Sequence, residues 1–194
     1  MTNRIQIQYY KTAIGELILG CFDDRLCLLD FRYRKMRTRV DHRIRKGLNA
    51  EFSIANHQLL DTTRRQICEY LRHQRATFDI PLIMVGTDFQ KSVWRALQKV
   101  PYGTTSSYAR LAKAVGRENA VRAVAGANGA NALSLIIPCH RIIGSDGSLA
   151  GYGGGVPIKK RLLKLEQTGP FAKPPNESQT QAQQQLSLPI DDRN

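Results

Sequence analysis

The sequence predicts two domains: an N-terminal α/β domain built on a small sheet, and a mainly helical C-terminal domain. Three patterns carry this prediction. Residues 1 to about 30 alternate apolar and polar side chains as strands do, residues 54–73 repeat apolar side chains at helical spacing, and helical spacing dominates from residue 89 onward. A chain of 194 residues can form one large or two small domains with real cores. We expect domains at 1–84 and 85–169, followed by a tail at 170–194.

The strands and helix of the first domain each have their own pattern. The alternating strand residues are Ile5, Ile7 and Tyr9, then Leu17, Leu19 and Cys21, then Leu26, Leu28 and Asp30. The helix predicted over 54–73 gathers apolar residues on one side, namely Leu59, Leu60, Ile67, Tyr70 and Leu71. Residues 78–85 look extended and link the domains. A dense basic run at 32–46 is expected to be a solvated face or a mobile loop, with a second phosphate contact as the alternative.

The second domain is predicted to be a series of helices. A helix over 89–100 buries Phe89, Val93, Ala96, Leu97 and Val100. Ser106 and Ser107 can cap the next helix, and Gly116 can end it. A further helix, from about residue 119 to 127, consists of small side chains except Arg122. It either lies close against another surface with Arg122 projecting, or is a buried core helix. Pro157 fits the first turn of the last helix, which leads to Glu166.

The most informative segment places Cys139 and His140 side by side, after an apolar run and a proline. A thiol is a strong nucleophile only as the thiolate, and a neighbouring imidazole can hold it in that form near neutral pH. A glycine-rich loop at 151–155 follows, and Glu166 offers a carboxylate downstream. Together these residues form a nucleophile, a base and an orienting acid. The alternative is that Cys139 is only a small buried hydrophobe.

An ordered set of motifs between about residues 85 and 169 resembles one known family. The matching segments are 89–94, 100–105, 107–108, 122–124, 128–131, Pro138-Cys139-His140-Arg141, 151–155 and 162–166. Each is weak alone, but the ordered set is highly specific. The chain resembles the O6-alkylguanine-DNA alkyltransferases, also called methylated-DNA–protein-cysteine methyltransferases. Residues 13–17 carry a looser likeness in the first domain. The resemblance implies a ribonuclease H-like N-terminal domain and a C-terminal domain with a winged helix-turn-helix.

The resemblance also implies a reaction and a role for each matched residue. The family flips an O6-alkylated guanine out of the duplex and transfers the alkyl group irreversibly to a cysteine, so each molecule works once. Cys139 would be the acceptor, His140 would take the thiol proton through a bound water, and Glu166 would orient that histidine. Tyr108 would hydrogen-bond the leaving guanine, and Asn131 would hold the turn before the active site.

The remaining assignments that follow from the resemblance concern DNA and the base pocket. Arg122 would fill the gap left by the flipped base. The other residues implied to lie at the DNA are Ser107, Ala123 and Ala127, and the residues implied to shape the base pocket are Ile142, Tyr152, Gly153 and Gly154. A helix faced with small residues suits a minor groove only about 6 Å wide. O4-alkylthymine is expected as a second substrate.

Four positions bear on how this chain compares with the family pattern. The family usually has proline at the position of Ala132 and often at that of Ser134, so we expect a looser segment leading to Cys139. Gly154 is expected to leave one wall of the pocket unobstructed. Non-reactive relatives replace the cysteine, whereas this chain keeps Cys139, which predicts an active protein.

Composition agrees with a nucleic-acid partner. The formal net charge is +13 and the sequence pI is ≈ 10.0, which favours a polyanion, although acidic proteins or a membrane surface would also attract such a chain. No apolar run approaches the roughly 20 residues of a membrane span, and the start lacks a signal-peptide core, so we expect a cytoplasmic, nucleoid-associated monomer. Besides Cys139, the cysteines Cys21, Cys27 and Cys68 are expected to be packed, without disulfides, structural zinc or any cofactor.

The tail and two rival functions complete the expectations. The segment from Gly169 is rich in Pro, Gln, Ser and Asn and is expected to be disordered. Within it, Gln185, Leu186, Ser187 and Leu188 resemble short peptides that bind bacterial sliding clamps. The first rival is a damage sensor or transcription regulator in which Cys139 acts as a sensor. The second is a cysteine hydrolase, which is less favoured because the nucleophile and base of cysteine proteases come from distant segments.

Overall fold

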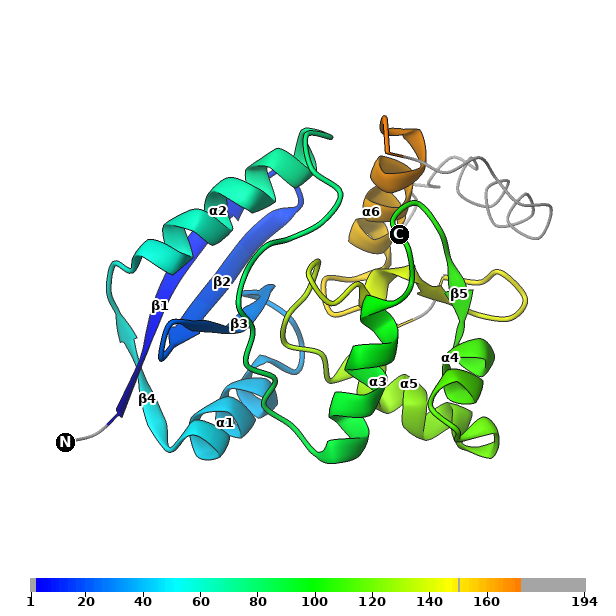
Figure 1. Ribbon diagram of the computed structural model, residues 1–194, viewed down its shortest axis with the longest axis horizontal. Coiled ribbons are helices and arrows are strands. Elements are labelled where there is room, and N and C mark those ends of the chain that lie inside the picture. Colours follow the sequence, from blue (N-terminus) through cyan, green and yellow to red (C-terminus); the bar gives the residue numbers. More distant parts are fainter. Residues whose placement is uncertain (1–2, 150, 172–194) are drawn as a thin grey trace.

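The computed structural model describes residues 3–149 and 151–171. The predicted tail and its clamp-binding peptide, Gln185 to Leu188, lie outside these residues. Figure 1 shows a sheet with two helices in one part of the molecule and a group of helices in the other. No helix in the described part of the chain is long and apolar enough to cross a bilayer.

The first part is a four-stranded sheet with a helix on each face. Its strands are β1 (Asn3–Thr12), β2 (Gly15–Phe22), β3 (Arg25–Phe31) and β4 (Ala50–Ile54), in the order β3-β2-β1-β4. The first three strands are antiparallel, and β4 runs parallel to β1. Because successive side chains alternate across a strand, Leu17 and Leu19 pack towards α2 (Gln58–Leu71), whereas Ile18 packs towards α1 (Arg37–Leu48). The three predicted strands are confirmed, but the alternation fails in β3. A register shift opposite Gly20 and Cys21 leaves Leu26 in the cluster on the α2 side and Leu28 in the cluster on the α1 side.

The basic run at 32–46 is mostly helical, so the expectation of a mobile loop was wrong. Val40 and Ile44, four residues apart, are buried against the sheet, and Leu48 packs on the same cluster. The long cationic side chains around them cover the outer surface of the helix, as Arg39 and Lys46 do. The expectation of a solvated face holds only in part, because Arg34 of the same run is buried and pairs with Asp30 at 2.7 Å.

The helix predicted over 54–73 is α2, which begins four residues later at Gln58. His57 caps it, since its ring Nδ1 accepts a 3.1 Å hydrogen bond from the Leu59 N–H. Residues 50–54 form β4 instead, a short strand that the sequence analysis did not predict. Histidine is an unusual cap, which is why the start of this helix was misplaced.

The second part contains the predicted helices. They are α3 (Asp88–Gln98), α4 (Tyr108–Ala114), α5 (Val121–Gly129) and α6 (Val156–Thr168), with the short parallel pair β5 (Ser106–Ser107) and β6 (Ile142–Ile143). Ser107 caps α4 by accepting a 3.1 Å hydrogen bond from the Arg110 N–H, and Gly116 follows that helix with a positive φ of 66°. Pro157 lies in the first turn of α6. These predicted caps and ends are confirmed.

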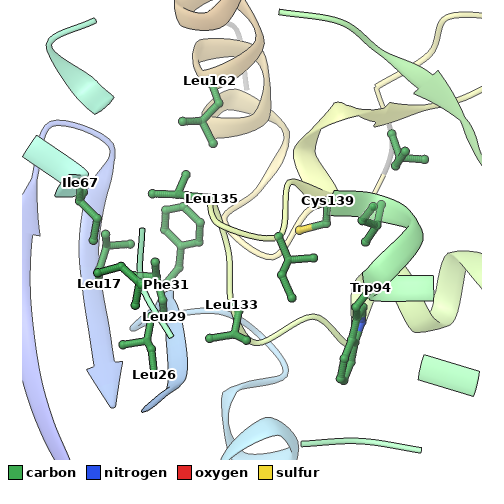
Figure 2. Packing of buried hydrophobic residues seen from close by; sticks show 14 of the residues in the cluster. Leu17, Leu26, Leu29, Phe31, Ile67, Trp94, Leu133, Leu135, Cys139 and Leu162 are labelled. Atoms are coloured by element: carbon green, nitrogen blue, oxygen red, sulfur yellow. The ribbon is translucent and has the colours of Figure 1, made fainter. Parts of the chain in front are cut away.

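The two parts meet along the outer strand β3. The predicted linking segment is extended there, since Leu26 donates to the Pro81 carbonyl at 2.8 Å and Ile83 donates to the Leu26 carbonyl at 3.0 Å. Further along the same edge, Leu29 donates to the Ala132 carbonyl at 2.8 Å. One hydrophobic cluster continues from the strands to Cys139 and Trp94, as Figure 2 shows. The segment that leads to Cys139 is thus held by the sheet.

Candidate active site

Cys139 begins a short 3-10 turn, Cys139–Arg141, at the end of the loop that follows α5. Its side chain is buried, and Asn131 holds it. The Asn131 Nδ2 donates hydrogen bonds to the Cys139 sulfur at 3.1 Å and to the Ile137 carbonyl at 2.8 Å, while its Oδ1 accepts one from the Leu133 N–H at 2.9 Å. Burial raises the pKa of the Cys139 thiol, although the Asn131 hydrogen bond opposes this. The resting thiol is therefore protonated at neutral pH and needs a base.

His140 is suited to be that base. Its Nε2 lies 2.8 Å from Glu166 Oε1, and both side chains are fully buried. An ionised carboxylate can only accept, so Nε2 carries the proton and Nδ1 has a free lone pair. Within residues 3–149 and 151–171, His140 Nδ1 has no hydrogen-bond partner. Burial lowers the pKa of His140 despite the neighbouring Glu166, which keeps the imidazole neutral.

The Glu166 carboxylate accepts five hydrogen bonds from described residues, one from His140 and four from other groups. Arg141 donates from Nε to Oε2 at 2.8 Å and from Nη2 to Oε1 at 2.9 Å, a bidentate ion pair. The Gly103 N–H donates to Oε2 at 3.2 Å, and the Tyr70 hydroxyl donates to Oε1 at 2.6 Å. Burial alone would raise the pKa of Glu166, but His140 and Arg141 bring it well below its usual range.

Two of these partners were missed by sequence reasoning. Arg141 was recognised only as part of the Pro138-Cys139-His140-Arg141 motif and was given no role. Tyr70 was assigned to the core side of α2, 96 residues before Glu166. One signal was available, because a buried tyrosine hydroxyl usually finds a hydrogen-bond partner. Nothing in the local sequence indicates that this partner lies in the other domain.

Two tyrosines lie near the thiol. A Cβ built on Gly151 would be 3.5 Å from the Tyr108 hydroxyl, which places Tyr108 against the glycine-rich loop. The Tyr152 ring is edge-on to His140, with centroids 6.2 Å apart. Burial first, and then the charge of Cys139, raise the pKa of both tyrosines. Both hydroxyls therefore stay protonated, which makes Tyr108 a potential donor to a bound base.

The rest of the predicted pocket is more enclosed than expected. A Cβ on Gly154 would lie 2.7 Å from the Phe31 ring, so the wall at Gly154 is filled by β3 and the expectation of an open wall was wrong. Gly153 is close to Arg34, with its Cβ position 3.2 Å from the guanidinium nitrogen. Ile142 is fully buried in β6. The lack of side chains at positions 153 and 154 serves contact between the domains.

The helix predicted to approach DNA exposes part of the expected set. Arg122 and Ala123 are exposed near the start of α5, and Gly126 is exposed one turn later. Ala127 is instead buried, and its carbonyl accepts a 2.8 Å hydrogen bond from Trp94 Nε1. Ala127 therefore faces α3 rather than solvent, because it lies on the same side of α5 as the buried Val124, about 100° around the helix from Gly126. Ser107 is half-buried as the cap of α4.

The segment between Asn131 and Cys139 is not loosened by the missing prolines, contrary to expectation. The Ser134 N–H donates to the Leu29 carbonyl at 2.7 Å, and its hydroxyl donates to Asp30 Oδ1 at 3.2 Å. A proline could make neither bond. The next residue, Leu135, has a positive φ of 72°, a strained value for a branched side chain that only the surrounding contacts can maintain. The segment is held tightly by β3.

Comparisons with known proteins agree over nearly the whole described chain. The model of the 6-O-methylguanine DNA methyltransferase ribonuclease-like domain matches residues 5–84, and that of the DNA binding domain of the same family matches residues 88–168. A methylated-DNA–protein-cysteine methyltransferase of Methanosarcina barkeri is 41% identical over 157 residues, which cover 81% of this chain and 94% of that protein. The constitutive enzyme of Bacillus subtilis is 40% identical over 164 residues, or 82% and 96%.

A solved structure gives the same result in three dimensions. The crystal structure of Mycobacterium tuberculosis OGT in complex with DNA matches with a TM-score of 0.71 and 34% identity, covering 85% of this chain and 93% of that one. The two domain models match in the expected order. The relatives are matched over almost their whole length, and the solved structure shares the two-domain fold. This chain belongs to the 6-O-methylguanine DNA methyltransferase family.

Proposed function

We propose that this protein repairs alkylated DNA by moving the alkyl group of O6-alkylguanine, and of O4-alkylthymine, irreversibly onto its own Cys139. One observation carries the proposal: a buried thiol, held by Asn131 at 3.1 Å, adjoins a neutral histidine whose Nε2 is fixed at 2.8 Å from Glu166. Such a constellation activates a nucleophile. The relatives named as methylated-DNA–protein-cysteine methyltransferases support the transfer reaction.

The reaction balances with the groups that the site provides. The Cys139 sulfur attacks the alkyl carbon, so that a carbon–sulfur bond forms while the bond from carbon to guanine O6 breaks. The electron pair of the broken bond stays on the guanine. His140 Nδ1 accepts the thiol proton through a bridging water, and Tyr108 donates a hydrogen bond to the departing guanine. The proton taken from the thiol finally ends on the guanine. The thioether product is stable in water, so each molecule reacts once.

We infer that α4 and α5 form the winged helix-turn-helix that holds the DNA. A base must leave the stack before its O6 atom can be attacked, at a cost of a few kcal/mol. The exposed face of α5 carries small side chains at Ala123 and Gly126, which permit close approach to the narrow minor groove. Arg122, exposed at the start of the helix, is placed to fill the vacated stack. The DNA complex of the M. tuberculosis relative supports DNA as the partner.

The first domain is proposed to be ribonuclease H-like. Its three antiparallel strands are followed by a fourth that is parallel to the first, with α1 as the connection. The ribonuclease-like family model that matches residues 5–84 supports this assignment.

Intact-mass spectrometry tests the function directly. The protein is mixed with a duplex that carries one O6-methylguanine, alongside Cys139→Ala and, as a matched control, Cys68→Ala, which removes a half-buried thiol outside the site. We expect one methyl group per molecule on the wild type and on Cys68→Ala, and none on Cys139→Ala. Tight binding to the lesion without a mass change would overturn the proposal in favour of a damage sensor.

A further inference from the structure

A groove of about 700 Å³ lies between α1 and α3, where the two domains adjoin. Its charged and titratable lining residues are His42, Arg43, Lys46 and Lys91. No Asp or Glu is among the described residues that line it. The helix α1 itself carries five Lys or Arg residues and a single Asp. Its apolar lining residues are Leu48, Ile83, Met84 and Val85. The groove therefore combines an apolar lining with cationic side chains contributed by both domains.

The groove is rigidly connected to α5, the helix proposed to enter the minor groove. Arg43 Nη2 donates a 2.7 Å hydrogen bond to the Ala130 carbonyl, at the C-terminal end of α5. The same guanidinium lies over the Trp94 ring, 5.3 Å from its centroid, and Trp94 Nε1 donates to the Ala127 carbonyl at 2.8 Å. Arg43 thus lines the groove and at the same time helps to fix this end of α5. Figure 1 shows α1, α3 and α5 along the same edge of the molecule.

The region around Arg43 holds more guanidinium groups than carboxylates. Arg34 and Arg37 share the buried carboxylate of Asp30, at 2.7 Å and 3.0 Å, and Arg37 also pairs with Asp41 at 2.7 Å. The two carboxylates thus face three guanidinium groups, those of Arg34, Arg37 and Arg43. Burial first, and then the charges of Arg34 and Arg37, together lower the pKa of Arg43 to about 10. An anion held in the groove would relieve this repulsion.

The geometry of DNA indicates which anion that is. A helix with its side chains is about 10–12 Å across, whereas the minor groove is only about 6 Å wide. A helix that approaches the minor groove therefore brings the elements beside it against the flanking phosphates. We propose that the groove between α1 and α3 binds the phosphate backbone of the strand that passes the C-terminal end of α5. This contact rests on the repair function proposed above and extends the DNA-binding surface onto the N-terminal domain.

The salt dependence of binding to an undamaged duplex tests this contact. Each phosphate that a protein neutralises adds about 0.9 to the magnitude of the slope of log K against log salt. Lys46→Ala combined with Lys91→Ala removes two charges from the groove and leaves Arg43 and its packing intact. The matched control is Arg161→Ala with Lys164→Ala, which removes two exposed charges from α6, at the opposite edge of the molecule.

We expect the slope of the groove variant to be smaller in magnitude by about 1.8, and that of the control to equal the wild-type slope. Equal slopes in the groove variant and the control would overturn the proposal. So would an unchanged slope together with a changed oligomeric state in light scattering, since a second copy would then occupy the groove. Methyl transfer to wild-type Cys139, measured in parallel, separates the two proposals. If the wild type gains a methyl group and the slopes are equal, only the groove proposal fails; if it gains none, the repair function fails.

Discussion

The hydroxyl of Tyr70 on α2 donates a 2.6 Å hydrogen bond to Oε1 of Glu166 on α6. The tyrosine belongs to the first domain and the carboxylate to the second. The Tyr70 ring is fixed by an edge contact with Tyr102 and a tilted contact with Phe78, with centroids 6.0 Å and 5.3 Å apart. The N-terminal domain therefore takes part in the candidate active site, because it supplies a hydrogen-bond donor to the carboxylate that fixes the orientation of His140.

Tyr70→Phe should change both stability and the pH profile of methyl transfer. The substitution keeps the ring and removes one donor to a buried anion, a loss of about 1.5–3 kcal/mol in the free energy of unfolding. With one fewer donor, Glu166 directs more of its negative charge at His140 and raises the pKa of that imidazole. We expect the acid limb of the single-turnover rate to move to higher pH. Denaturant unfolding and quench-flow transfer assays measure the two effects.

Tyr102→Phe is the matched control. The Tyr102 hydroxyl is buried beside the same network but has no hydrogen-bond partner among the described residues. Removing it should therefore leave both stability and the pH profile close to the wild type. If the two phenylalanine variants behave alike, the Tyr70 hydrogen bond contributes nothing to the site.

The buried, neutral His140 should make both activity and stability fall in acid. The pKa of His140 is lowered in the folded protein relative to an unfolded value of about 6.5, so the unfolded chain binds more protons in this range. The stabilisation that comes from keeping His140 neutral is complete above the pKa of this imidazole in the unfolded chain. It is lost as the pH falls through the lower pKa of the imidazole in the folded protein. The transfer rate should fall over the same lower range. An acid limb centred above about 6.5 would contradict this prediction, and His140→Gln should remove the limb.

Glu166→Gln should destabilise the protein as well as impair transfer. It leaves the largely buried guanidinium of Arg141 without its anion, at a cost of about 3–5 kcal/mol in the free energy of unfolding. It also allows His140 to adopt the other tautomer, with an expected loss of about 10²–10⁴-fold in transfer rate. Glu16→Gln is the control, because Glu16 pairs with a partly exposed Arg32 and should cost only about 0–1 kcal/mol. Equal losses of stability in the two variants would contradict the role of the buried pair.

Local pattern was sufficient to predict most of the secondary structure and the chemical centre. Alternation gave the first three strands, and apolar spacing with Ser107 and Gly116 gave α4 with its cap and its end. The pair of Cys139 and His140 is adjacent in sequence, so its proximity needed no knowledge of the fold. The helix α1 was missed because only Val40 and Ile44 mark its buried side among many arginines.

Contacts between distant segments could not be predicted in this way. Tyr70 meets Glu166 across the two domains, which β3 joins by pairing with the linking segment and with residues 132–134. The filled wall at Gly154 depends in the same way on Phe31 of β3. The absence of a proline at position 134 predicts a looser segment only if backbone freedom is the sole effect of Ser134. Its N–H and hydroxyl find partners on β3 that no local pattern reveals.

The two family prolines should therefore have very different effects on stability when they are introduced into this chain. Ser134→Pro removes the hydrogen bonds to the Leu29 carbonyl and to Asp30, so we expect a loss of about 2–4 kcal/mol in the free energy of unfolding. Ala132→Pro removes no hydrogen bond present in the described structure, because only the carbonyl of Ala132 is bonded there. It should be close to neutral. Thermal unfolding of both variants measures the difference, and the reverse order would show that the β3 contacts do not hold this segment.

Gly126 offers a test of α5, the helix proposed to enter the minor groove, with one variant that reports on stability and another that reports on affinity. A Cβ at this position meets nothing within 4 Å, and the residue has no positive φ. Gly126→Ala should therefore raise the free energy of unfolding by about 0.5–1 kcal/mol through helix propensity alone. Gly126→Leu should remain folded and weaken binding to duplex DNA by about tenfold or more, because the larger side chain keeps α5 out of a minor groove about 6 Å wide. Thermal unfolding confirms the fold, and fluorescence anisotropy measures the affinity. Unchanged affinity in the leucine variant would show that DNA binds to another face of the protein.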